Sequence, residues 1–134
     1  MTPRIEQELE LIRKHFPNCE VKQSDGLIWV KIPGYKIPTG LGWNKTSTDV
    51  AFHFPIGYPG VPPYGLYVAC NLLFNNNNVL GGVSLRPPFD GEWGLLSWTF
   101  DDTEWKSRLN PDIVRGINML NFIHSFSDRF KEGA

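Results

Sequence analysis

The stretch Phe52–Pro63, with the sequence FHFPIGYPGVPP, constrains the fold of this chain more than any other. It holds four prolines in nine residues, at Pro55, Pro59, Pro62 and Pro63. Each proline ring fixes φ, and each also pushes the preceding residue toward extended geometry. We therefore expect a strand that runs into a stiff loop, with another strand directly after it.

The chain before this loop shows a helix and a hairpin. Apolar residues recur at helical spacing over residues 3–16, where Thr2 is placed to cap a helix and Pro3 suits its first position. Two strands are expected over 19–24 and 27–33, because the Asp25-Gly26 pair between them is a strong hairpin signal.

Alternating residues predict two further strands, one on each side of the loop. Over residues 47–54 large apolar side chains alternate with Asp49, Ala51 and His53, which predicts one buried face and one face in water. After the loop, Leu66, Val68 and Cys70 share one face of a fourth strand. Short links between these strands indicate an antiparallel meander.

The second half of the chain carries a weaker pattern. Residues 71–109 read as a long irregular loop that contains three tryptophans, and loops of this length inside a compact domain are usually functional. A helix is expected over 111–130, capped by Asn110. Its expected apolar stripe is Ile113, Ile117, Leu120 and Phe130, with Ile123 beside it. The sequence thus predicts an α+β fold: an N-terminal helix, a four-stranded antiparallel meander, a long loop and a C-terminal helix.

Size and charge exclude several classes of protein. With 134 residues and a net charge of −1, we expect one domain over 1–134 and no basic footprint for nucleic acid. No apolar run reaches membrane-spanning length, and the charged start of the chain does not resemble a signal peptide. Cys19 and Cys70 stand far apart, which is typical of free thiols in a reducing cytoplasm.

The residues that could carry chemistry are scattered. The three histidines lie on three different predicted elements, so neither a metal site nor a cofactor is expected. Cys70 shares a strand face with Leu66 and Val68, which predicts a buried, unreactive thiol. The acidic cluster Asp101, Asp102 and Glu104 reads as a solvated loop.

Taken together, these motifs resemble the ubiquitin-conjugating enzyme superfamily, and in particular its bacterial branch called prokaryotic conjugating-enzyme family E. The resemblance covers nearly the whole chain, and the proline loop is its most specific part. It also includes the first helix, the Asp25-Gly26 hairpin, the segment PGYKIPTG (33–40) followed by Asn44-Lys45-Thr46, and Trp93, Ser97 and Trp105-Lys106 ahead of the last helix. It implies the ubiquitin-conjugating fold and a bacterial origin.

The residue that the family uses as its nucleophile is missing. Conjugating enzymes carry their modifier as a thioester on a cysteine that lies eight residues before a tryptophan, and counting back from Trp105 gives Ser97. The family's His-Pro-Asn triplet is absent as well. Ser97 is thus a candidate by position only, and a serine hydroxyl needs a base that the sequence does not show.

Three functions follow from this. The resemblance implies an atypical conjugating-enzyme homologue without the catalytic cysteine, whose partners are a ubiquitin-like protein and an activating enzyme. One alternative is an active enzyme that forms an oxyester on Ser97. The other is an unrelated binding module that uses the tryptophan loop for a small ligand or glycan. The expected binding residues are Tyr58, Trp93, Trp98 and Trp105.

Overall fold

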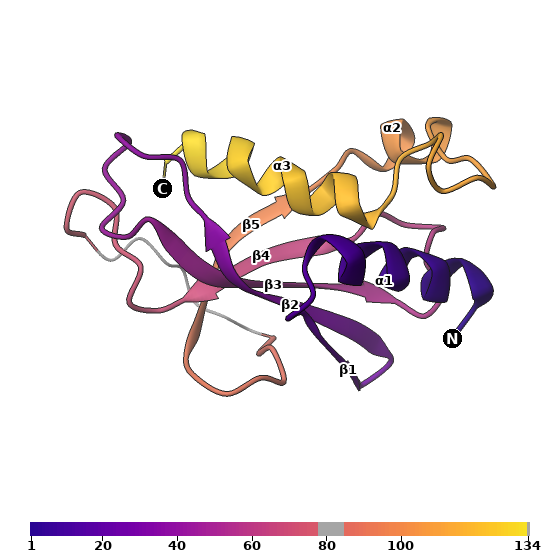
Figure 1. The fold of residues 1–134 in the computed structure, drawn as a ribbon, viewed down its shortest axis with the longest axis horizontal. Coiled ribbons are helices and arrows are strands. Elements are labelled where there is room, and N and C mark those ends of the chain that lie inside the picture. Colours follow the sequence, from indigo (N-terminus) through magenta and orange to yellow (C-terminus); the bar gives the residue numbers. More distant parts are fainter. Residues whose placement is uncertain (78–84, 134) are drawn as a thin grey trace.

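The computed structural model describes residues 1–77 and 85–133. Within them the chain forms helix α1 (Pro3–His15), a five-stranded sheet, a short helix α2 (Asp102–Ser107) and helix α3 (Met119–Lys131) (Figure 1). The strands are β1 (Glu20–Ser24), β2 (Leu27–Lys36), β3 (Ser47–Pro55), β4 (Tyr64–Ala69) and β5 (Trp93–Thr99). Each strand pairs antiparallel with the next, so the sheet is a meander in the order β1-β2-β3-β4-β5.

The local signals before the proline loop are confirmed. The Thr2 side chain accepts a hydrogen bond from the Ile5 amide at 3.2 Å and begins α1, which ends one residue before Phe16 and two before Pro17. Asp25 and Gly26 both have positive φ, as a tight hairpin turn between β1 and β2 requires. Strand β2 is longer than predicted, because it continues past an irregularity in its pairing with β3.

The main core lies on one face of the sheet, beneath α1 and α3. The two helices pack against each other over this face (Figure 1). Phe52 on β3 meets Phe122 and Phe126 on α3, with ring centroids 5.3 and 6.1 Å apart. Burying this many large apolar side chains supplies the main driving force for folding. The helices thereby fix where the loops at both ends of the sheet lie.

The other face of the sheet is also covered, which contradicts the prediction that one side of β3 faces water. Ala51 is fully buried there, with Trp29 and Tyr67 from the neighbouring strands. Phe89 and Trp93 pack onto these residues, because the segment before β5 runs along the side of the sheet away from α3 (Figure 1). A second, smaller aromatic core results.

The prediction of a long irregular region over 71–109 was wrong, since this region contains β5 and α2. The alternation in β5 is interrupted at Ser97, whose φ is +64°, and the pairing of β4 with β5 shifts register between Gly65 and Tyr67. An interrupted alternation reads as a loop when only the sequence is seen. In the part of the chain that the structure describes, the sheet therefore has five strands rather than four.

The last helix also begins later than predicted, at Met119 instead of near residue 111. Asn118 caps it in a reciprocal pair of hydrogen bonds with Asn121, and the predicted cap Asn110 instead closes a turn by accepting from the Asp112 amide at 2.8 Å. Gly116 packs so closely that an added Cβ would lie 2.7 Å from the Arg108 carbonyl oxygen. Of the predicted stripe, Ile117 and Phe130 are buried, but Ile117 precedes the helix, and Ile113 and Leu120 are only half-buried. The buried face of α3 is Met119, Phe122, Ile123, Phe126 and Phe130.

Candidate functional site

The proline loop is fixed to both the first helix and α2. The Tyr58 hydroxyl donates a hydrogen bond to Glu8 Oε1 at 2.6 Å, and the Trp105 indole donates to the Pro59 carbonyl at 2.9 Å. The rings of Tyr58 and Trp105 lie 5.7 Å apart, and Pro63 is buried. The expected packing of Tyr58 and Pro63 against the body of the protein is confirmed, whereas Pro62 is only half-buried.

Glu8 holds this arrangement together. Its side chain is 1% exposed and accepts hydrogen bonds from the Arg4 guanidinium, the Tyr58 hydroxyl and the Met119 amide, each at 2.6 Å. Burial, together with the adjacent Glu8 carboxylate, raises the pKa of Tyr58, so the phenol remains a donor at neutral pH. One carboxylate therefore joins α1, the proline loop and the first residue of α3.

Apolar side chains are exposed at the tip of the fixed loop. Ile56 is 50% exposed and Val61 is 44% exposed. Val114, in the connection between α2 and α3, is 77% exposed. Arg4 ties that connection to α1 through the carbonyls of Asn110 and Ile117. Exposed apolar groups on a rigid support are suited to binding another protein.

Ser97 lies on β5 with an exposed side chain and a left-handed backbone. Its Oγ is 3.0 Å from the Tyr64 hydroxyl, and its carbonyl accepts a hydrogen bond from Arg129 Nε at 3.2 Å. Left-handed φ costs a non-glycine residue roughly 1–2 kcal/mol, which the surrounding contacts must offset. Sequence reasoning missed Tyr64 and Arg129 as neighbours of Ser97, because only the sheet and α3 bring them together.

The nearby carboxylates are engaged elsewhere. Asp101 caps α2 by accepting from the Glu104 amide at 3.0 Å, and Asp102 pairs with Lys106 at 3.1 Å. Among the described residues, neither a carboxylate nor an imidazole forms a hydrogen bond with the Ser97 hydroxyl. The side chain that contacts the Ser97 hydroxyl is the phenol of Tyr64.

The three tryptophans of the predicted binding loop do not form a common surface. Trp93 is 8% exposed in the outer aromatic core, whereas Trp105 is fully buried on the helix side. Trp98 is half-buried, and its indole donates to Ser125 Oγ on α3 at 2.8 Å. Tyr58 is also buried, so Trp98 is the one member of the four expected binding residues that is not buried.

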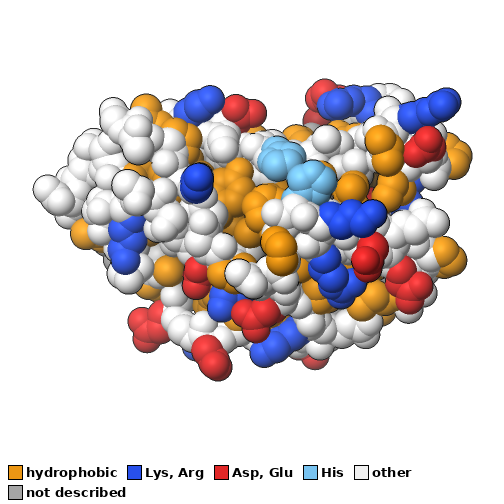
Figure 2. All heavy atoms as spheres, viewed as in Figure 1, with side chains coloured by type: hydrophobic (Ala, Val, Ile, Leu, Met, Phe, Trp, Pro, Cys, Tyr) orange, Lys and Arg blue, Asp and Glu red, His pale blue; other side chains and the backbone are white. Residues whose placement is uncertain are grey.

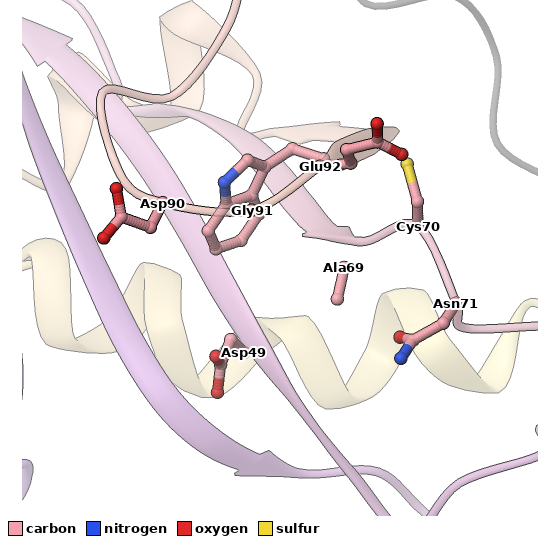
Figure 3. A pocket seen from close by; sticks show the side chains of 8 residues that line it. Asp49, Ala69, Cys70, Asn71, Asp90, Gly91 and Glu92 are labelled. Carbon is pink, nitrogen blue, oxygen red and sulfur yellow. The ribbon is translucent and has the colours of Figure 1, made fainter.

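The structure corrects the expected burial of Cys70. Strand β4 ends at Ala69, so the alternation that placed Cys70 inward stops one residue too early, and Leu72 enters the core instead. Cys70 is half-buried at a pocket of about 330 Å³ (Figure 3). The pocket is lined by Asp49, Ala69, Cys70, Asn71, Asp90, Gly91, Glu92 and Trp93. Cys19 is also half-buried, and burial raises the pKa of its thiol.

The histidines occupy two places. His53 is half-buried on the outer face of the sheet, 4.6 Å from the Trp29 ring, and burial lowers its pKa to about 4. His15 and His124 come from α1 and α3 and meet with ring centroids 6.3 Å apart, a pairing that the sequence did not reveal. In the described part of the chain, His, Cys, Asp and Glu side chains do not gather in threes as a metal site requires.

No family model, curated protein or solved structure matches this chain significantly. The family resemblance therefore rests on the motifs quoted above and stays a prediction. Among the described helices, none is both long and apolar enough to cross a membrane.

Proposed function

We propose that this chain is a ubiquitin-conjugating-like domain that binds a ubiquitin-like protein or its activating enzyme without forming a thioester. The observation that carries the proposal is the proline loop, the most family-specific motif, held by Glu8 and Trp105 so that Ile56 and Val61 face outward. A rigid apolar tip loses little conformational entropy on binding. Its support by α1, α2 and α3 gives it one fixed geometry.

The absence of thioester chemistry is supported by where the thiols lie. Thioester transfer needs an accessible thiolate at the position that Ser97 occupies in the motif. Cys19 packs beside the main core and Cys70 lies at the end of β4 that is remote from Tyr64 and Ser97. Neither cysteine belongs to the strand segment that carries Ser97.

A binding measurement tests the proposal. The probes are a ubiquitin-like protein and its activating enzyme, each titrated calorimetrically against the purified domain. We expect binding that Ile56→Asp and Val61→Asp weaken by about tenfold or more, because a carboxylate would be desolvated in an apolar contact. Leu85→Asp is the matched control, since Leu85 is 37% exposed but lies on the segment before β5. Absence of binding, or equal loss in the control, would refute the proposed role.

A second function is favoured by one contact, the 3.0 Å approach of the Tyr64 hydroxyl to Ser97 Oγ. In this alternative the Ser97 oxygen attacks the carbonyl carbon of a thioester held by the activating enzyme. The new C–O bond replaces the C–S bond, and the hydroxyl proton passes to the released thiolate. The product is an oxyester on Ser97.

Incubation with the activating enzyme, the ubiquitin-like protein and ATP separates the two functions. The binding function predicts no adduct on the wild type, whereas Ser97→Cys should allow a reductant-sensitive one, because a thiol needs less activation than an alcohol. An adduct that survives reductant, is cleaved by hydroxylamine and disappears in Ser97→Ala would establish the oxyester. A reductant-sensitive adduct on Cys19 or Cys70 would refute both functions.

A further inference from the structure

A groove opens where the end of α1, the end of β2 and the outer side of α3 meet. Its volume is about 330 Å³, and it is lined by Phe16, Gly34, Tyr35, Lys36, His124 and Ser127. His124 lines the groove, and its ring lies 6.3 Å from that of His15. Figure 2 shows two adjacent histidine side chains with apolar surface next to them. The groove is independent of the proline loop, since none of its lining residues belongs to that loop.

The walls of the groove are held in place before any ligand binds. The Tyr35 hydroxyl donates to the Ile123 carbonyl at 2.8 Å and lies 3.2 Å from Ser127 Oγ, which fastens β2 to α3. The Phe16 ring packs against His124 with centroids 6.1 Å apart. Gly34 leaves one side open, because a Cβ added there would meet nothing within 4 Å. A preformed apolar groove of this size accepts one or two side chains.

The lining of the groove carries one permanent charge, the ammonium of Lys36. Lys36 is exposed, and among the described residues it takes part in no ion pair. The His15 ring is oriented by a 3.1 Å contact between Nδ1 and the Leu11 carbonyl. Of the nearby carboxylates, Asp49 accepts from the Gly34 amide and lies 4.0 Å from Lys31, and Asp128 is exposed beside Ser127.

We propose that this groove binds a segment of a partner protein that presents an apolar side chain flanked by carboxylates. The apolar side chain would fill the space between Phe16 and Tyr35, where it is removed from water. The carboxylates would face the Lys36 ammonium, and one of them would accept a hydrogen bond from the imidazole of His124. A basic segment fits less well, because it would bring like charge to Lys36.

The test is a titration followed by the backbone amide signals of the isotopically labelled protein. Three capped synthetic peptides serve as probes: Glu-Asp-Leu-Phe-Asp-Glu, its neutral counterpart Gln-Asn-Leu-Phe-Asn-Gln, and Glu-Asp-Ala-Ala-Asp-Glu. We expect the first to shift amides of Gly34, Lys36 and His124 and to bind about fivefold to tenfold more tightly than either counterpart. The preference for charge should shrink when ionic strength rises from about 0.05 M to about 0.5 M.

Charge-reversal variants locate the effect. Lys36→Glu and His124→Glu should each weaken binding of the acidic peptide about fivefold or more, and both residues are exposed, so neither substitution disturbs the core. Lys22→Glu makes the same change in net charge as Lys36→Glu on an exposed residue of β1 and should leave binding unchanged.

Three results would overturn the proposal. They are equal affinity for the charged and neutral peptides, shifts that map outside the groove, and equal weakening by Lys22→Glu. If the groove signals move with protein concentration alone, a second copy of the chain occupies the groove, and the proposal of a separate partner is wrong.

Discussion

Glu8 shows how one side chain can decide the geometry of a distant surface. A buried carboxylate is costly unless it is paired and fully hydrogen-bonded, and Glu8 meets this condition through Arg4, Tyr58 and the Met119 amide. The sequence held a signal for it, because residue 8 lies on the same helical face as Ile5 and Ile12. A charged residue on an apolar stripe indicates a partner inside the fold.

We expect Glu8→Gln to lower the free energy of unfolding by about 2–3 kcal/mol, because the amide keeps the shape but leaves the Arg4 guanidinium without its counter-charge. Urea denaturation measures this. Glu6→Gln is the control: Glu6 is exposed in the first turn of α1 and should cost less than about 1 kcal/mol. Similar losses for the two variants would contradict the role assigned to Glu8.

The two cysteines should differ in reactivity. Cys19 packs against the main core and burial raises its pKa, so less thiolate is present at a given pH. Cys70 lines an open pocket. Iodoacetamide at mildly alkaline pH should therefore modify Cys70 faster than Cys19 in the native protein, as followed by peptide mass spectrometry. Faster modification of Cys19 would contradict this ranking.

At the scale of elements, the connection between α2 and α3 covers residues for which the sequence predicted the start of the last helix. Residues 110–118 fold as turns that return the chain to α1, and Gly116 allows the two ends of the connection to touch. The Ile117 amide donates to the Arg108 carbonyl at 3.1 Å, which closes this loop on itself. The position of exposed Val114 depends on that closure.

Gly116→Ala should therefore destabilise the protein by about 1–3 kcal/mol, since the new methyl group would overlap the Arg108 carbonyl and the Asn110 side chain. Gly57→Ala provides the control, because an added Cβ there meets nothing within 4 Å. It should change stability by less than about 0.5 kcal/mol. Thermal unfolding of both variants makes the comparison, and an equal effect would show that close packing at Gly116 is not the cause.

For the whole molecule, the burial of His53 on the outer face of the sheet makes the free energy of unfolding depend on pH. Burial on the outer face lowers the pKa of His53 to about 4, whereas the unfolded chain has the ordinary value near 6.5. Above pH 6.5 the imidazole is neutral in both states and has no effect. As pH falls from 6.5 toward 4, the unfolded state binds the proton more readily, so stability is lost.

His53→Gln should remove this part of the acid sensitivity. The loss of unfolding free energy between pH 7 and pH 4.5 should be smaller in the variant than in the wild type, because glutamine does not titrate. His15→Gln, on the exposed end of α1, controls for the loss of a histidine elsewhere. Parallel pH profiles for the wild type and His53→Gln would show that His53 is not buried as described.

The sequence predicted those elements whose signals are local. Thr2 with Pro3 fixed the start of α1, and Asp25-Gly26 fixed the first hairpin, because caps and tight turns are determined by neighbouring residues. Strand β5 escaped prediction, since the left-handed backbone at Ser97 breaks its alternation and only pairing with β4 reveals it. The late start of α3 depends on Gly116 contacting Arg108, which no periodicity contains.

In the candidate site too, the features set by local sequence were predictable and those set by tertiary contacts were not. The buried positions of Tyr58 and Pro63 follow from the proline loop, whose stiffness is covalent. Trp93 and Trp105 lie on opposite faces of the sheet because of tertiary packing. The sequence alone therefore could not show whether the tryptophans share one surface. The contact between His15 and His124 likewise joins two helices that are far apart in the chain.

The connections of Glu8 also bear on how this chain reaches its native state. Its hydrogen-bond partners Tyr58 and Met119 lie 50 and 111 positions further along the chain. During synthesis the carboxylate therefore emerges long before the amide of Met119 exists, and until then it stays hydrated. Contacts of such long range delay folding, since the loop between them must close first. The proline loop would thus acquire its final support only after α3 has been made, so that in an incomplete chain the loop would not yet be held in its final position.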